Sequence, residues 1–223
     1  MHKYAIIVAG GSGLRMGSSL PKQFLLLRGK PVLWHTLRAF TEAYSDIEII
    51  LVLPSSHLDA GNELVNDFLN HKFKVTTGGD SRFSSVKKGL QFVEQKSVVF
   101  VHDGVRCLVT PELIRRCYEA TMEKGNAVPA VTASDTIRIV SGPDSEQIDR
   151  DKVRIVQTPQ TFFSELLLTA FEQDYLPNFT DEASVVERTG VKINIIPGEG
   201  SNIKITQPVD LLMAEKILQE KEP

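Results

Sequence analysis

Short apolar runs alternate with amphipathic stretches along most of this chain. The runs are rich in β-branched residues, which favours buried strands, and they lie at residues 4–8, 47–53, 73–75, 98–101, 127–131 and 191–196. Between them, apolar residues at steps of three and four predict helices at 31–43, 58–69, 83–93, 110–124, 163–171 and 180–190, and a last one from 208. This alternation indicates an α/β fold, a mostly parallel Rossmann-like sheet with helices on both faces.

Capping residues support several of these helix boundaries. Thr110 before Pro111 is a good helix start, and Gly125 ends the same helix. Asp80 or Ser81 is the expected cap of the helix at 83–93. Thr180 is the expected cap of the helix at 180–190, with acidic residues in its first turn. The last helix carries its apolar residues at Val209, Leu212, Met213 and Ile217.

The alternation breaks between residues 136 and 160. Residues 137–140 and 153–157 read as two strands joined by a turn-rich tip at 141–144, with no helix between them. A two-stranded arm is only marginally stable alone. We therefore expect a β-arm that protrudes from a single domain spanning residues 1–223 and packs on a second copy of the chain. The alternative is an arm that folds back on its own subunit.

Composition narrows the classes of protein that the chain can belong to. It has 223 residues, 42% of them hydrophobic, and a net charge of −3, so a general nucleic-acid surface is not expected and any anion site must be locally basic. Cys107 and Cys117 fit no disulfide framework or zinc spacing and suit a reducing cytoplasm. The first apolar run is far shorter than the roughly 20 residues that cross a membrane, so a cytoplasmic location is expected.

The loop after the first strand predicts a phosphate site. Ala9-Gly10-Gly11-Ser12-Gly13 removes most side chains, so that several backbone N–H groups can point at one anion, and Arg15 and Lys22 add positive charge. The loop does not contain the Walker pattern, and Met16 stands where the dinucleotide fingerprint needs a small residue. A glycine-rich connection with solvated cations is the alternative interpretation.

Other polar motifs also follow predicted strands. They are Gly78-Gly79-Asp80, His102-Asp103 and Ser134-Asp135. Ligands of open α/β sheets bind at the carboxyl ends of the strands, so these motifs are expected to meet the glycine loop at one edge of the sheet. Asp103 ends a buried strand, where a carboxylate is costly unless it is paired or bound to a metal ion such as Mg²⁺.

These motifs resemble a known family. Residues 9–16 followed by Pro21-Lys22-Gln23 look like the signature loop of nucleotidyltransferases that activate sugar and polyol phosphates, most closely the 2-C-methyl-D-erythritol 4-phosphate cytidylyltransferases of the non-mevalonate isoprenoid pathway. Segments at 78–85, 102–106, 135–136, 158–160, 180–184 and 202–206 are similar to the same family, in the same order. Gly104-Val105 and Cys107 depart from it, because the family has two alanines and a proline there.

The resemblance implies an activity and a set of site residues. The activity is conversion of CTP and 2-C-methyl-D-erythritol 4-phosphate to the CDP-polyol and pyrophosphate, with Mg²⁺ as cofactor. The implied catalytic residues are Arg15, Lys22 and Lys204. The implied CTP-binding residues are Ala9, Gly10, Gly11, Ser12, Gly13, Gly79, Asp80 and Ser85. The implied polyol-binding residues are Asp103, Arg106, Arg150 and Thr180, with Arg150 delivered by the arm of a second subunit and Asp103 also a possible magnesium ligand.

Other functions remain open at this point. A ribitol 5-phosphate cytidylyltransferase shares the nucleotide half of the site, although residues 180–184 and 202–204 resemble the methylerythritol branch more closely. A catalytically inactive nucleotide-binding protein is the alternative of another class, and the presence of Arg15, Lys22, Asp103 and Lys204 argues against it. Met16 disfavours a nicotinamide-dependent oxidoreductase.

Overall fold

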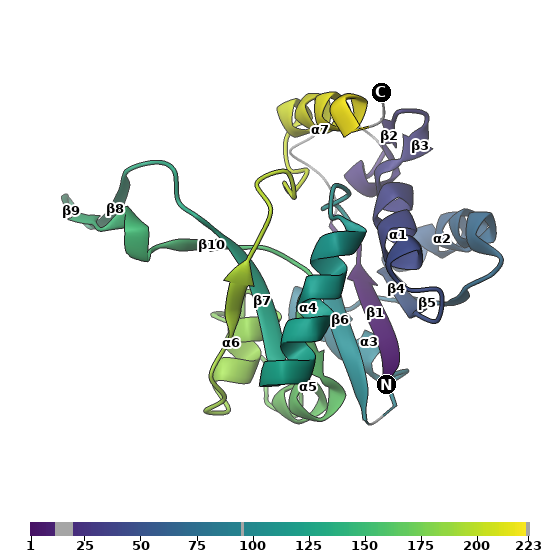
Figure 1. The fold of residues 1–223 in the computed structure, drawn as a ribbon, viewed down its shortest axis with the longest axis horizontal. Helices are drawn as coiled ribbons and strands as arrows, with labels where there is room; N and C mark the ends of the chain where they lie inside the picture. The colour runs from purple at the N-terminus through teal and green to yellow at the C-terminus, as the bar shows by residue number, and fades with distance from the viewer. Residues whose placement is uncertain (12–19, 95, 222–223) are drawn as a thin grey trace.

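A computed structural model describes residues 1–11, 20–94 and 96–221 of the chain. Figure 1 shows a twisted sheet between two layers of helices, with a thin arm extending to one side. Three of the expected phosphate-binding residues, Ser12, Gly13 and Arg15, lie outside the described residues. The description below therefore concerns the rest of the predicted site.

The central sheet is mostly parallel where the polar loops leave it. β1 (His2–Val8) lies between β4 (Glu48–Leu53) and β6 (Ser97–Asp103), and β5 (Lys72–Thr77) adds to β4, all in parallel. β7 (Asn126–Thr132) belongs to the same sheet. Within the described residues eight strands join, in the order β10-β7-β11-β6-β1-β4-β5, with β12 beside β7. This mixed sheet confirms the predicted α/β class.

Helices cover both faces because successive side chains of each strand point to opposite sides. Ile7 packs with α1 (Val32–Ala43), α2 (Leu58–Val65) and α4 (Pro111–Lys124) on one face. Ile6 packs with α3 (Arg82–Leu90), α5 (Ser164–Ala170) and α6 (Glu182–Glu187) on the other. Short 3₁₀ turns occupy Lys22–Phe24, Ser55–His57, Asn66–Phe68 and Arg150–Lys152.

The last helix sits outside these two layers. α7 (Pro208–Lys221) covers a small cluster with the ribbon formed by β2 (Leu26–Leu27) and β3 (Lys30–Pro31). Ala214 is its buried residue, and Ile217 packs against the cluster. The other three apolar residues that were expected on this helix, Val209, Leu212 and Met213, are exposed. The face of α7 that packs against the protein is therefore not the face that carries most of the expected apolar residues.

The arm differs from its predicted pairing. β8 (Ile137–Ser141) pairs with β9 (Asp144–Ile148), and not with residues 153–157. β10 (Arg154–Val156) has instead returned to the main sheet, antiparallel to β7. In Figure 1 the β8–β9 ribbon stands well away from the sheet, and Ile139 and Val140 on it are exposed.

Two other strands and three helix ends also depart from expectation. β11 (Gln160–Phe163) was not predicted and runs antiparallel between β6 and β7, whereas the strand expected at 191–196 is β12 (Ile195–Pro197). α2 ends at Val65, before the 3₁₀ turn. α3 ends at Leu90 and not at 93, and α6 ends at Glu187, three residues before Gly190.

The predicted caps were right at α4 and wrong at α6. Thr110 Oγ1 accepts a hydrogen bond from the Leu113 N–H at 3.1 Å, and Gly125 ends α4 with φ of 87°. At α6 the cap is Asp181 and not Thr180, because Asp181 Oδ1 accepts from the Ser184 N–H at 2.9 Å. The hydroxyl of Ser184 accepts in return from the Asp181 N–H at 3.3 Å, which closes a capping box.

Backbone hydrogen bonds place three polar loops side by side at the carboxyl ends of the strands. The Gly104 N–H donates to Val8 O at 2.9 Å, so the end of β6 lies against the end of β1. The Ala9 N–H donates to Val52 O at 2.9 Å, and the Gly78 N–H to Leu53 O at 2.7 Å. The expected meeting at one sheet edge is confirmed for the start of the glycine loop, Gly78-Gly79-Asp80 and His102-Asp103, whereas Ser134-Asp135 does not line the cavity there. None of the described helices is both long and apolar enough to cross a membrane.

Gly198→Ala is expected to destabilise the sheet edge that carries the segment 199–205. A Cβ at Gly198 would lie 2.5 Å from Gln157 Oε1 and 3.1 Å from the backbone carbon of Ala130, which cannot move cheaply. We expect the free energy of unfolding to fall by about 1–3 kcal/mol in urea titrations. The matched control is Gly200→Ala, whose Cβ meets nothing within 4 Å and which should be neutral. Equal effects of the two substitutions would contradict this packing.

Candidate active site

A cavity of about 500 Å³ opens at the carboxyl ends of β1, β5 and β6. Its size is ordinary for a small-molecule site. It is lined by Val8, Ala9, Gly10, Gly11, Lys22, Gln23, Pro54, Ser55, Gly78, Gly79, Asp80, Ser81, Arg82, Ser85, Asp103, Val105 and Lys204. Segments that are far apart in the sequence thus share one hollow.

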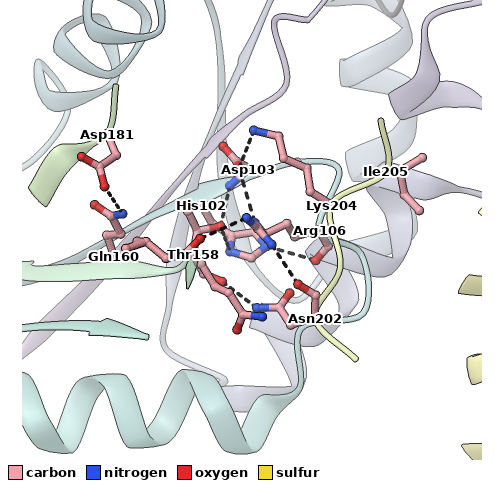
Figure 2. A network of polar contacts seen from close by, with 12 residues as sticks. His102, Asp103, Arg106, Thr158, Gln160, Asp181, Asn202, Lys204 and Ile205 are labelled. Atoms are coloured by element: carbon pink, nitrogen blue, oxygen red, sulfur yellow. Dashed lines mark hydrogen bonds and ion pairs between the residues drawn. The ribbon is translucent and has the colours of Figure 1, made fainter. Parts of the chain in front are cut away.

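Two lysines from opposite ends of the chain reach this cavity together. Lys22 follows Pro21 in the 3₁₀ turn and is buried, and its Nζ donates to Ile205 O at 3.0 Å. Lys204, the residue before that carbonyl, places its Nζ 2.9 Å from Asp103 Oδ2. Figure 2 shows Lys204 reaching over Asp103. Because residues 204 and 205 are adjacent in the chain, these two contacts hold the ammonium groups of Lys22 and Lys204 at the same wall of the cavity.

The loop after β5 is shaped by its glycines and by the start of α3. The Gly79 N–H donates to Ser85 Oγ at 3.0 Å, and a Cβ at Gly79 would lie 2.6 Å from Ser84 Cβ. Only glycine therefore allows the loop to lie this close to the helix. Ser81 caps α3 by accepting from the Ser84 N–H at 3.0 Å, as one of the two expected caps. Asp80 is left at the cavity wall.

Asp103 is the charged centre of the site. Its side chain is only 10% exposed, and Arg82 Nη2 lies 3.3 Å from Oδ1 while Arg106 Nε lies 3.5 Å from Oδ2. Burial acts to raise the pKa of Asp103, but the attraction of Arg82, Lys204 and Arg106 outweighs it, so the pKa is held well below its usual range. Asp103 is thus a carboxylate at any pH near neutrality.

A buried histidine holds the backbone at Asp103. His102 is fully buried, which lowers its pKa to about 3 and keeps the ring neutral. Thr158 Oγ1 accepts from the Asp103 N–H at 3.1 Å and lies 2.9 Å from His102 Nδ1. His102 Nε2 lies 3.2 Å from Arg106 O. In the neutral ring, Nε2 must carry the proton to donate to Arg106 O, so that Nδ1 accepts from the threonine hydroxyl.

Three of the expected polyol-binding residues do not line the cavity. Arg106 lies beneath Asp103, and its guanidinium donates to Asn202 O at 2.9 Å, which ties the strand end to the segment that carries Lys204 (Figure 2). Arg150 donates to Ser134 O at 2.8 Å at the base of the arm. Thr180 is exposed. The structure therefore brings together Ala9, Gly10, Gly11, Lys22, Gly79, Asp80, Ser85, Asp103 and Lys204, with Arg106 attached through Asp103.

Sequence reasoning assigned no role to three residues that build this site. Arg82 lines the cavity and contacts Asp103. Gln23 is buried and donates from Nε2 to Ala9 O at 2.9 Å, which fixes the start of the glycine loop. Glu182 is buried and pairs with Arg82. Arg82 and Gln23 stand inside motifs that were recognised, so their position there was the available signal. For Glu182 the only signal in the sequence was its position directly after Thr180-Asp181.

The fold and this cavity define an α/β nucleotidyltransferase. Glycine loops and lysines gather at the strand ends, where phosphates bind in such sheets, and they surround a carboxylate that stays ionised. A family model described as IspD, 2-C-methyl-D-erythritol 4-phosphate cytidylyltransferase, matches residues 3–220. The chain belongs to this family, and it is a cytidylyltransferase of isoprenoid biosynthesis.

Individual relatives agree with the family model. A 2-C-methyl-D-erythritol 4-phosphate cytidylyltransferase of Bacteroides thetaiotaomicron is 47% identical over 222 residues, covering 98% of this chain and 100% of the relative. The bifunctional enzyme IspD/IspF of Desulfotalea psychrophila is 40% identical, and the match covers 97% of this chain and 56% of that enzyme. The crystal structure of 4-diphosphocytidyl-2C-methyl-D-erythritol synthase from Anaerococcus prevotii superposes with a TM-score of 0.85 at 29% identity, covering 98% of each chain.

Thr158→Val is expected to destabilise the protein by about 1–3 kcal/mol, because it removes the buried acceptor of the Asp103 N–H while keeping the side-chain volume. Thr136→Val is the matched control, since Thr136 is exposed. Urea unfolding of both variants measures the difference. A Thr158→Val protein as stable as Thr136→Val would show that the link from Asp103 to His102 contributes nothing.

Proposed function

We propose that the chain transfers a cytidylyl group from CTP to 2-C-methyl-D-erythritol 4-phosphate, giving 4-diphosphocytidyl-2-C-methyl-D-erythritol and pyrophosphate. The observation that carries this proposal is the single cavity in which Lys22 and Lys204 meet the two glycine loops and Asp103. The matches of the whole chain to the cytidylyltransferase family support the choice of nucleotide and acceptor.

The reaction would proceed by in-line attack of the acceptor's phosphate oxygen on the α-phosphorus of CTP. The α-phosphorus then bonds to that oxygen and releases pyrophosphate. Catalysis of this kind depends on positioning and on stabilising charge. Lys22 would neutralise the charge that develops on the α-phosphate, and its hydrogen bond to Ile205 O already fixes its direction. Arg15 would hold the leaving pyrophosphate, and Lys204 would contact the reacting phosphates beside Asp103.

The nucleotide would lie along the glycine loops. Ala9, Gly10 and Gly11, with Ser12 and Gly13, would bind phosphates through backbone N–H groups. Gly79, Asp80 and Ser85 lie on the other wall and would contact cytosine and ribose. Cytosine offers one amine donor and two acceptors, which backbone groups of a glycine loop can satisfy.

Mg²⁺ is the proposed cofactor. Two carboxylates line the cavity, Asp80 and Asp103, and the described residues contain no group of three or more His, Cys, Asp or Glu suited to a metal ion. Mg²⁺ usually takes one or two carboxylates and completes its shell with substrate phosphates and water, so this donor set fits a metal that binds together with the nucleotide. Asp103 is the candidate ligand, and the bound metal would neutralise phosphate charge.

A homodimer would complete the acceptor side. Arg150 stands at the base of an arm with exposed Ile139 and Val140, outside the cavity of its own chain. We propose that the arm packs on a second copy and delivers Arg150 to the acceptor phosphate there, near Thr180. The 1–223 chain would then act as one nucleotidyltransferase domain per subunit. Cys107 and Cys117 are buried and form no disulfide, which suits a cytoplasmic location.

Purified protein supplied with CTP and Mg²⁺ should release pyrophosphate with 2-C-methyl-D-erythritol 4-phosphate and much less with ribitol 5-phosphate. A coupled pyrophosphate assay over both acceptors, with CTP alone as the blank, measures this. Equal rates would assign the chain to ribitol phosphate chemistry. Release from CTP without either acceptor would point to simple hydrolysis.

Lys22→Ala and Arg150→Ala should each impair catalysis for a different reason. Loss of Lys22 removes transition-state charge stabilisation and should lower kcat by about 100-fold or more. Loss of Arg150 should raise the acceptor KM while leaving CTP binding unchanged. Lys72→Ala is the control, since Lys72 is exposed on β5.

Mixing the two variants at an acceptor concentration far below the KM of Arg150→Ala, where each alone has little activity, tests the arm directly. Exchange of subunits places an intact Lys22 site opposite an intact Arg150 arm in each mixed dimer. The mixture should recover roughly a quarter of the normal rate, because half of the dimers are mixed and each has one complete site. If no activity returns after verified exchange, Arg150 acts within its own subunit or not at all.

A further inference from the structure

Arg82 is held between two acidic side chains that come from different parts of the site. Its Nε and Nη2 lie 3.4 Å and 3.3 Å from Asp103 Oδ1. Its Nη1 donates to Glu182 Oε1. The Glu182 side chain is 1% exposed, whereas Arg82 is 25% exposed and lines the cavity. A guanidinium presents five N–H donors in a rigid fork, so one side chain can hold both carboxylates.

The contacts of Arg82 connect segments that serve different substrates in the proposed reaction. Arg82 is the first residue of α3, directly after the nucleotide loop at 78–81. Glu182 is the first residue of α6 and follows Thr180-Asp181, on the proposed acceptor side. Asp103, the other partner of Arg82, is at the end of β6. A shift of the nucleotide loop would therefore be transmitted to the acceptor segment through one ion pair.

The surroundings of Glu182 make this ion pair hard to replace. Burial raises the pKa of Glu182 even though Arg82 opposes that shift. Its second oxygen, Oε2, is buried and has no hydrogen-bond partner among the described residues. A buried carboxylate with so few partners depends on its one cation to stay ionised. Arg82 thus holds the 180–184 segment together with Gln160, whose amide donates to Asp181 Oδ2 and accepts from the Ala183 N–H, both at 2.8 Å.

We infer that Arg82 is a positioning residue and that the Arg82–Glu182 ion pair couples the two substrate sites, so that CTP in the cavity strengthens binding of the acceptor phosphate at the 180–184 segment. This inference rests on the proposed function. The coupling is reciprocal, so acceptor bound first strengthens CTP binding by the same factor. Arg82 itself contacts the two carboxylates and acts on substrate binding through them.

Glu182→Gln tests this coupling because it keeps the size of the side chain and removes its charge. Calorimetry with a non-hydrolysable CTP analogue and the acceptor measures each affinity alone and in the presence of the other ligand. We expect the acceptor to bind about tenfold more tightly with the analogue in the normal protein, and this factor to fall to about one in the variant. Affinity for each ligand alone should stay within about twofold, and the acceptor KM at saturating CTP should rise.

Glu187→Gln is the matched control, because it makes the same substitution on the same helix at an exposed position. Arg82→Lys provides a second variant, since lysine keeps the charge but cannot hold both carboxylates in a fork. It should also lose the coupling, and its combination with Glu182→Gln should add nothing further.

The outcomes separate this inference from the proposed function. If Glu182→Gln matches Glu187→Gln in acceptor KM and in coupling, the inference is wrong while the proposed activity stands. Equal weakening of CTP and acceptor binding, each measured without the other ligand, would also overturn it, because that is the result of general loosening. If the normal protein does not use CTP with the acceptor, the proposed function itself is wrong.

Discussion

The site depends on one buried negative charge and the cations that hold it. Asp103 contacts Arg82 from α3, Arg106 from its own loop, and Lys204 from the segment before α7. A carboxylate in a buried position is tolerated only when it is paired, and the buried guanidinium of Arg106 would be costly to leave unpaired in turn. The same interaction therefore joins three segments and stores positive charge where a triphosphate would bind. Fold stability and ligand chemistry rest here on a single group of atoms.

The cations around Asp103 are not equivalent. The Arg106 side chain is 13% exposed and is also bonded to Asn202 O, so it belongs to the framework beneath the cavity. The Lys204 side chain is 41% exposed and lines the cavity, so a ligand can reach it. Arginine suits the fixed position because its fork satisfies several acceptors at once, whereas lysine presents a compact charge on a flexible stem. The residue types thus match the two environments.

What could be predicted from sequence was local in origin. β1, β4 and β6 carry apolar runs of their own, and the loops after β1, β5 and β6 carry glycines or acids, so the parallel half of the sheet and its active edge followed directly. β10 was misassigned because residues 154–156 were paired with the nearest strand in sequence, although their partner is β7. β11 has four residues after Pro159 and shows too short a pattern to recognise.

Thr180 and Asp181 are both capping residue types, so residue type alone could not choose between them. Ser184 decides for Asp181, because it stands at the third helical position counted from that cap. Arg82 and Glu182 met only through folding, so no spacing in the sequence could indicate their ion pair.

The contact between Lys22 and Ile205 O has a consequence for how the protein is made. Chains emerge from the ribosome at about 5–20 residues per second, and a domain generally folds as a unit. Both apolar layers over the sheet include side chains from beyond β6, such as Ile114 on one face and Phe162 on the other. Lys22 in turn has no Ile205 carbonyl to meet until residue 205 has emerged. The nucleotide pocket of a nascent chain is therefore completed only when the segment around residue 205 has left the exit tunnel.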